Sequence, residues 1–131
     1  GGHGALTLAM KHPQLFRSVS AFSPIASPTR CPWGEKAFGA YLGPEREVWR
    51  AHDAALLIEA EKASPFDDIL IDQGTADQFL VDQLKPELLE KAARKVGQKL
   101  TLRRQDGYDH SYFFMATFVS EHVAFHAARL A

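Results

Sequence analysis

Two polar loops contain the residues best suited to acid–base chemistry, Asp77 and His110. Asp77 lies in the segment 72–79, directly after an apolar run, and His110 lies in the segment 106–111, directly before a long helical pattern. An aspartate followed later in the chain by a histidine matches the last two members of a catalytic triad in the order Ser, Asp, His. In such a triad the histidine takes a proton from the serine, and the aspartate holds the histidine ring.

The first residues predict where the serine belongs. Gly1-Gly2 is followed at once by helical spacing, and a nucleophile elbow, G-x-S-x-G, likewise stands at a sharp turn before a helix. If Gly1 is the last glycine of that motif, the serine stands two places before it, and no serine within the chain has an elbow around it. Each feature alone has a plainer explanation as a cap, turn or packing residue. Their combination in this order favours the triad.

The elements that must position these loops alternate along the chain. Short apolar or alternating runs predict strands, within residues 16–22, 68–72 and 100–104. Helical spacing of apolar residues predicts helices, over residues 5–10, in short pieces over 35–63, over 86–96 and over 111–130. Breaks in the second helical region are expected at Gly39, Gly43-Pro44 and His52-Asp53, and the proline-rich residues 23–34 are expected to be irregular. This alternation indicates an α/β fold with a mainly parallel sheet flanked by helices.

Composition excludes several classes of partner. The 131 residues include 15 Lys+Arg and 16 Asp+Glu, for a formal net charge of −1, so no nucleic acid and no acidic membrane surface is expected to bind. No run reaches the roughly 18 to 20 apolar residues that span a bilayer. The single cysteine, Cys31, is expected to be a small buried residue in an intracellular, reducing compartment, which predicts a cytoplasmic protein.

Other candidate residues have weaker claims to chemistry. Asp72 is an alternative acid, but it falls inside the strand pattern, whereas Asp77 lies in the loop where it can reach a histidine. Asp109 is expected to point away from the site. His122 and His126 are four residues apart on a helix, yet without a third ligand they predict a partly exposed helix face and no metal site.

Blocks of sequence along the chain resemble the S-formylglutathione hydrolase family, also called the esterase D family. The matching blocks are residues 1–6, 31–38, 41–43, 69–74 with 77–80, and 107–114. The resemblance implies the α/β-hydrolase fold, with this chain as the C-terminal part of one domain and the elbow in an upstream half. It also implies hydrolysis of S-formylglutathione to glutathione and formate, activity on simple carboxylic esters, no cofactor, and a homodimer.

The same resemblance implies roles for individual residues. Asp77 would be the triad acid and His110 the base, with the serine preceding Gly1 in a Ser-Met-Gly-Gly run. Trp33 and Phe79 lie in segments that belong to the active-site edge, so both are expected to line the substrate pocket; for Trp33 the alternative is a packing role. His3 is expected to pack beside the elbow. Two other functions stay open: acyl transfer to another acceptor, and a non-catalytic fragment that only binds.

Overall fold

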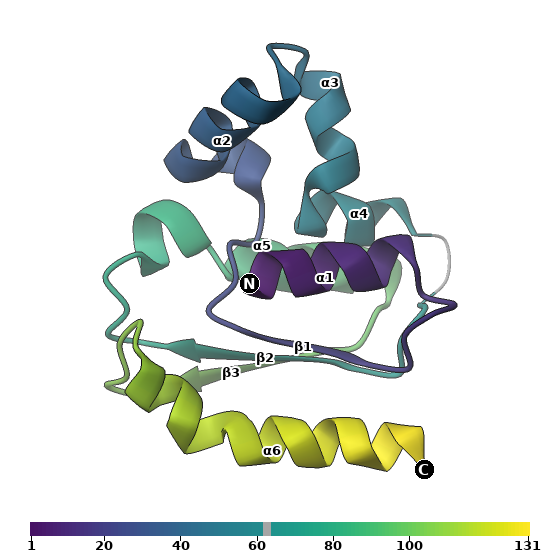
Figure 1. Ribbon diagram of the computed structural model, residues 1–131, viewed down its shortest axis with the longest axis vertical. Helices are drawn as coiled ribbons and strands as arrows, with labels where there is room; N and C mark the ends of the chain where they lie inside the picture. Colours follow the sequence, from purple (N-terminus) through teal and green to yellow (C-terminus); the bar gives the residue numbers. More distant parts are fainter. Residues whose placement is uncertain (62–63) are drawn as a thin grey trace.

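The computed structural model describes residues 1–61 and 64–131, which form a three-stranded parallel sheet between two layers of helices. The strands are β1 (Val19–Phe22), β2 (Ile69–Gly74) and β3 (Leu100–Gln105), in the order β1-β2-β3. In register, Phe22 pairs with Asp72 and Asp72 with Arg103. The loops that follow β2 and β3 therefore leave the sheet side by side at the carboxyl ends of the strands (Figure 1).

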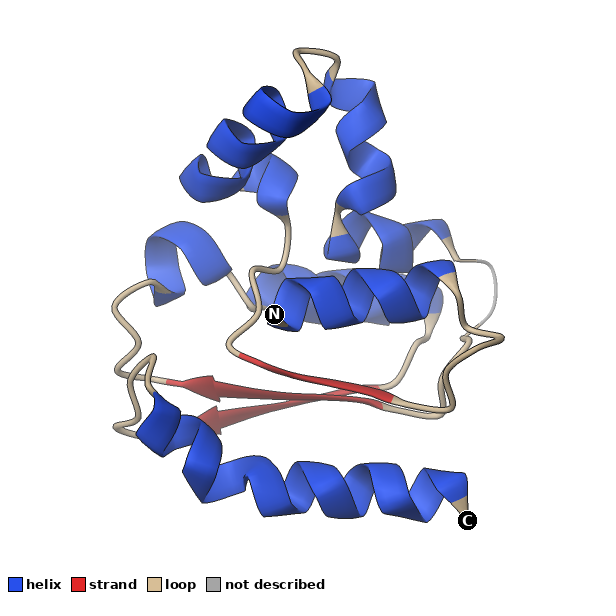
Figure 2. Ribbon diagram, viewed as in Figure 1, coloured by secondary structure: helices blue, strands red, loops and turns tan. Residues whose placement is uncertain are grey.

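The helices divide into layers on either side of this sheet (Figure 2). One face is covered by α1 (Gly2–Lys11), α4 (Ala54–Ala60) and α5 (Glu87–Val96), and the other by α6 (Tyr112–Leu130). The remaining helical segments lie beyond the first layer or in loops: η1 (Pro28–Arg30), α2 (Pro32–Leu42), α3 (Arg46–Trp49), η2 (Arg50–His52) and the short π-helical turn η3 (Leu80–Leu84). No helix in the described part of the chain is long and apolar enough to cross a membrane.

Local sequence explains where several helices begin and end. Asp53 caps α4, because its side chain accepts a hydrogen bond from the Leu56 N–H at 3.1 Å. Ser111 caps α6 in the same way. Gly97 ends α5 in the left-handed conformation, with φ of +73°.

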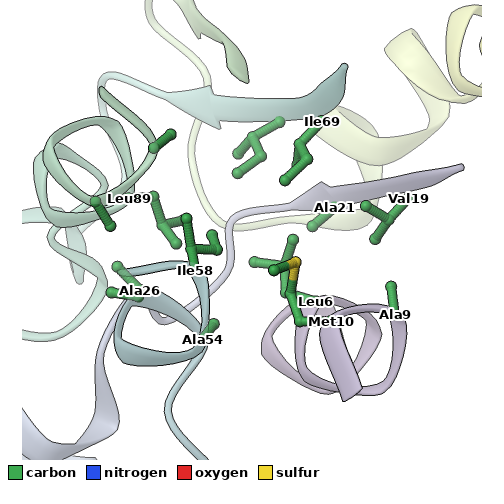
Figure 3. Close-up of a cluster of buried hydrophobic side chains, with 14 of the residues drawn as sticks. Leu6, Ala9, Met10, Val19, Ala21, Ala26, Ala54, Ile58, Ile69 and Leu89 are labelled. Atoms are coloured by element: carbon green, nitrogen blue, oxygen red, sulfur yellow. The ribbon is translucent and has the colours of Figure 1, made fainter. Parts of the chain in front are cut away.

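The apolar core fills the space between the sheet and the layer of α1, α4 and α5 (Figure 3). Its fully buried side chains come from every element of that layer and from alternate strand positions: Leu6, Ile58, Ile69, Ile71 and Leu89. Because side chains alternate across a strand, the neighbouring positions in register, such as Ser20, Phe22 and Asp72, face α6 instead. This second face carries both polar and apolar side chains, and only Phe114 and His122 of α6 are buried.

The structure confirms the α/β prediction and corrects several details. Helix α2 runs from Pro32 to Leu42 without the predicted break at Gly39, because an isolated glycine is tolerated within a helix. Residues 23–34, which were expected to be irregular, include η1 and the start of α2. Of the predicted helical region 35–63, residues 62–63 lie outside the described part of the chain.

The last helix also differs in which side it buries. Five apolar positions are predicted for this helix, and two of them, Phe114 and Phe118, are buried and half-buried. The other three, Val119, Val123 and Leu130, are 46%, 63% and 73% exposed. Helical periodicity therefore identified Phe114 and Phe118 correctly, but it did not identify the buried His122.

Candidate active site

The side chain of Asp77 is fully buried in the loop after β2. Its Oδ1 atom accepts a hydrogen bond from the Phe79 N–H at 2.9 Å, which makes a tight turn of the loop. Its Oδ2 atom accepts one from Nε2 of Gln73 at 3.1 Å. The carboxylate is thus held from both sides before any partner from another loop is counted.

His110 provides the third contact to that carboxylate. Its Nδ1 atom lies 2.7 Å from Oδ2 of Asp77, and its side chain is 40% exposed while that of Asp77 is buried. A carboxylate only accepts hydrogen bonds, so Nδ1 carries the proton in this pair. Nε2 has no hydrogen-bond partner among the described residues and is the nitrogen available to take a proton.

Close backbone contacts hold the two loops together. The Ala76 N–H donates to the Tyr108 carbonyl at 2.9 Å, and the Thr75 hydroxyl accepts from the Gly107 N–H at 2.8 Å. Gly74 allows this approach, because a Cβ atom there would lie 2.7 Å from the carbonyl carbon of Tyr108 and nearer still to its oxygen. A glycine at the end of β2 is therefore a condition for the contact between the acid and the histidine.

The two predicted pocket residues lie beside this pair. The rings of Trp33 and Phe79 are 4.5 Å apart between centroids, and the ring of Phe79 meets that of His110 edge-on at 5.4 Å. The Trp33 N–H also donates to Oε1 of Gln83 at 3.0 Å, which fixes the start of α2 to η3. The structure thus brings Trp33, Phe79 and His110 into one row, with Trp33 43% exposed at its outer end.

A cavity of about 290 Å³ opens next to His110. Trp33 and Phe79, which were expected to line the pocket, do not line this cavity. Its lining combines the end of β1 with the start of α6: Phe22, Ser23, His110, Ser111, Tyr112, Phe114 and Met115. Ser23 adopts a left-handed backbone, with φ of +46°, and strained residues of this kind cluster at functional sites. The cavity is close to the lower end of the size range of small-molecule sites.

Asp72, the alternative acid, forms hydrogen bonds with other described residues and not with His110. Its fully buried carboxylate accepts hydrogen bonds from Arg103 at 2.6 and 2.8 Å, from Gln105 at 2.9 Å and from His122 at 2.6 Å. Burial alone would raise the pKa of Asp72, but the hydrogen bonds from His122, Arg103 and Gln105 outweigh it and lower the pKa to about 2. Asp72 makes no hydrogen bond to His110 in the described part of the chain.

The remaining sequence candidates are placed as follows. His3 accepts a hydrogen bond from the Ala54 N–H at 3.2 Å through Nε2, and burial lowers its pKa to about 4. Cys31 is buried, as predicted, and Asp109 is exposed. The prediction for His122 was wrong: it is buried and hydrogen-bonded rather than part of an exposed face.

Among the described residues, no group of three or more His, Cys, Asp or Glu side chains is arranged to hold a metal ion.

One residue of the site, Gln73, was not identified from the sequence. Gln73 supports Asp77 although no pattern singled it out, because a glutamine at the end of a strand gives no sign of its partner. Its Oε1 atom is buried and has no partner in the described part of the chain.

Comparisons with known proteins agree with this geometry. The family model described as "Putative esterase" matches residues 1–125. The S-formylglutathione hydrolase of Paracoccus denitrificans is 53% identical over 130 residues, which are 99% of this chain and 46% of the relative. The chain therefore spans about half the length of that curated relative.

Solved structures extend the comparison to three dimensions. An S-formylglutathione hydrolase from Agrobacterium tumefaciens superposes with a TM-score of 0.93 at 47% identity, over 98% of this chain and 46% of that one. A ferulic acid esterase superposes with a TM-score of 0.71 at 22% identity, over 95% of this chain and 46% of that one, which shows a shared fold alone. The chain has the α/β-hydrolase fold and belongs to the esterase family.

Proposed function

We propose that this chain supplies the acid and the base of a serine thioesterase that hydrolyses S-formylglutathione to glutathione and formate. The observation that carries the proposal is the 2.7 Å contact between Oδ2 of Asp77 and Nδ1 of His110, a residue that also lines a cavity. The names of the relatives at 53% and 47% identity support the choice of substrate.

In this proposal the nucleophile is a serine in the part of the relatives' length that this chain does not span, two places before Gly1. The 131 residues are then the C-terminal part of one domain, and the upstream part also supplies the oxyanion hole. A backbone N–H directly after the serine and one from an earlier loop are the usual donors of that hole.

The reaction then follows from the geometry of the pair. The serine oxygen attacks the formyl carbon while Nε2 of His110 takes the hydroxyl proton, and Asp77 stabilises the resulting imidazolium. Collapse of the tetrahedral intermediate breaks the carbon–sulfur bond, and His110 returns the proton to the glutathione sulfur. Water then attacks the formyl ester, His110 takes its proton, and collapse releases formate as the serine regains a proton.

Each feature of the pair suits this cycle. The three N–H donors around Asp77 hold its carboxylate in place. Nε2 of His110 has no partner among the described residues, which leaves it able to accept a proton from the serine and then from water. Trp33 and Phe79 then form an aromatic wall for the acyl or glutathione portion of the substrate.

Location and assembly belong to the same proposal. A cytoplasmic site of action fits the single buried cysteine and a substrate derived from glutathione. A homodimer is expected from the resemblance to the family alone.

Steady-state hydrolysis of S-formylglutathione by the full-length protein tests the proposal. His110→Ala is expected to lower kcat/KM by about 10³-fold or more, whereas the matched variant His12→Ala, at an exposed position outside the site, leaves it unchanged. Near-normal turnover in His110→Ala contradicts the assignment of the base. If an added alcohol is formylated faster than water consumes the substrate, the enzyme is an acyltransferase instead.

A further inference from the structure

Helix α6 contacts the second face of the sheet through a row of hydrogen-bonding side chains. Only two of its 19 residues are buried, Phe114 and His122. Apolar burial alone therefore does not account for how this long helix stays on the sheet. The polar side chains that join the two elements are Ser18, His126, Ser20, His122 and Asp72.

These five side chains form one continuous chain of hydrogen bonds. Ser18 Oγ lies 2.6 Å from Nδ1 of His126, whose Nε2 lies 2.8 Å from Oγ of Ser20. Oγ of Ser20 lies 2.8 Å from Nδ1 of His122, whose Nε2 lies 2.6 Å from Oδ2 of Asp72. Two of the four distances lie within the usual range of N–H···O hydrogen bonds, and the two at 2.6 Å are slightly shorter.

The chemistry of the groups gives the chain a direction. The Asp72 carboxylate only accepts, so Nε2 of His122 carries a proton and, in the neutral ring, Nδ1 accepts from the Ser20 hydroxyl. The Ser20 oxygen then accepts from Nε2–H of His126, and Nδ1 of His126 accepts from the Ser18 hydroxyl. Burial lowers the pKa of His126, which favours its neutral form. With both rings neutral, all four ring nitrogens are satisfied.

Aromatic packing connects this chain to the candidate active site. The ring of His122 stacks on that of Phe22 at 4.0 Å, and Phe22 meets Phe114 edge-on at 5.8 Å. Phe114 in turn packs against Tyr108 at 5.8 Å. The carbonyl of Tyr108 holds the loop of the acid through Ala76, so a shift of α6 would reach both loops of the pair.

We propose that this directed chain anchors α6 to the sheet and thereby sets the position of His110, which makes His122 and Ser20 positioning residues. The part that concerns catalysis rests on the proposed function. The anchor itself does not, because it is defined by the hydrogen bonds between α6, β1 and β2.

Imidazole ¹⁵N NMR of the full-length protein tests the direction of the chain. In both His122 and His126 the proton is expected on Nε2, with Nδ1 accepting from a serine hydroxyl. A proton on Nδ1 alone in either ring, or an imidazolium at His122, would overturn the proposal, because the neutral chain then could not run from Ser18 to Asp72. This measurement needs no substrate and is independent of the enzymatic activity.

Ser20→Ala tests the anchoring of α6. The matched control is Ser120→Ala, which removes the same hydroxyl group from an exposed position of α6. Ser20→Ala is expected to speed amide hydrogen exchange in α6 by about tenfold and to lower kcat by about tenfold with little change in KM. Ser20→Thr retains the hydroxyl and is expected to restore both. Ser120→Ala is expected to change neither.

The outcomes separate the two proposals. Unchanged exchange in Ser20→Ala refutes the anchor, whatever the activity. Faster exchange with an unchanged kcat refutes the positioning of His110. If the wild-type protein hydrolyses neither S-formylglutathione nor a simple ester, the proposed function fails, while NMR and exchange still decide the anchor.

Discussion

Replacing Asp77 by asparagine is expected to remove most of the activity while leaving the fold in place. The carboxylate accepts three N–H donors, from Phe79, Gln73 and His110 at 2.9, 3.1 and 2.7 Å. An asparagine amide keeps one oxygen and places an NH₂ group in the position of the other. The NH₂ group must therefore face either the Phe79 N–H or the donors of Gln73 and His110, and on that side two donors oppose each other.

The structure indicates which orientation the amide takes. With the NH₂ group toward Phe79, a backbone N–H loses its acceptor, at about 1–3 kcal/mol for an unsatisfied buried group. With the NH₂ group toward His110 and Gln73, both partners can adapt. Gln73 loses one contact but keeps its hydrogen bond to the Gly74 carbonyl at 3.0 Å, and His110 can move its proton from Nδ1 to Nε2. The second orientation is therefore favoured, and it blocks the nitrogen that must take the serine proton.

The expected loss is on the order of 10³- to 10⁴-fold in kcat/KM, which corresponds to about 4–5.5 kcal/mol of transition-state stabilisation. The assay compares hydrolysis of S-formylglutathione and of a simple nitrophenyl ester by the full-length Asp77→Asn protein and wild type. Imidazole ¹⁵N NMR should show the proton of His110 on Nε2 in the variant and on Nδ1 in wild type.

Asp109→Asn is the matched control, since Asp109 is exposed beside His110, and it is expected to stay within about threefold of wild type, as surface substitutions generally do. Activity of Asp77→Asn within tenfold of wild type would refute the assignment of the acid. So would a change of tautomer without any loss of rate.

Three further predictions concern the surroundings of the pair. Gly74→Ala should push the two loops apart and lower kcat/KM by about 10²-fold. Gly39→Ala, whose Cβ would lie 3.9 Å from its nearest neighbour, should leave kcat/KM unchanged. Equal rates in both variants would contradict the role given to the contact between Gly74 and Tyr108. Burial lowers the pKa of His3 from 6.5 to about 4, so the unfolded state binds more protons than the folded state below pH 6.5. The free energy of unfolding should therefore fall by up to about 3 kcal/mol between pH 6.5 and 4. Denaturant titrations should show a weaker dependence of this free energy on pH in His3→Gln than in wild type, and the same dependence in both proteins would contradict the prediction. Trp33→Ala should change kcat/KM for S-formylglutathione relative to that for a nitrophenyl ester by about tenfold or more, and an unchanged ratio would assign the contact with Phe79 to packing alone.

The Asp77–His110 contact was predictable because it depends on topology. Parallel strands end at one edge of a sheet, so polar residues after β2 and β3 meet there whatever the rest of the chain does. The choice of Asp77 over Asp72 followed from the same reasoning, because a residue inside a strand pattern cannot leave the sheet to reach a loop.

The role of α6 was not predictable from helical periodicity. Periodicity treats a histidine as a polar residue and assigns Val119 and Val123 to the buried side. The structure buries His122 instead, because Ser20 on β1 and Asp72 on β2 lie on the sheet face that it meets and hydrogen-bond to its two ring nitrogens. Only the pairing of β1 with β2, which a sequence does not reveal, places these partners together.

Serine labelling in the full-length protein tests the central claim most directly, that the Asp77–His110 pair activates a serine. A fluorophosphonate is expected to modify one serine, in the elbow upstream of Gly1, and peptide mapping identifies it. His110→Ala and Asp77→Asn should both slow that modification by several orders of magnitude, while Asp109→Asn leaves its rate unchanged. Labelling at the wild-type rate in His110→Ala, or modification of no serine at all, would contradict the account.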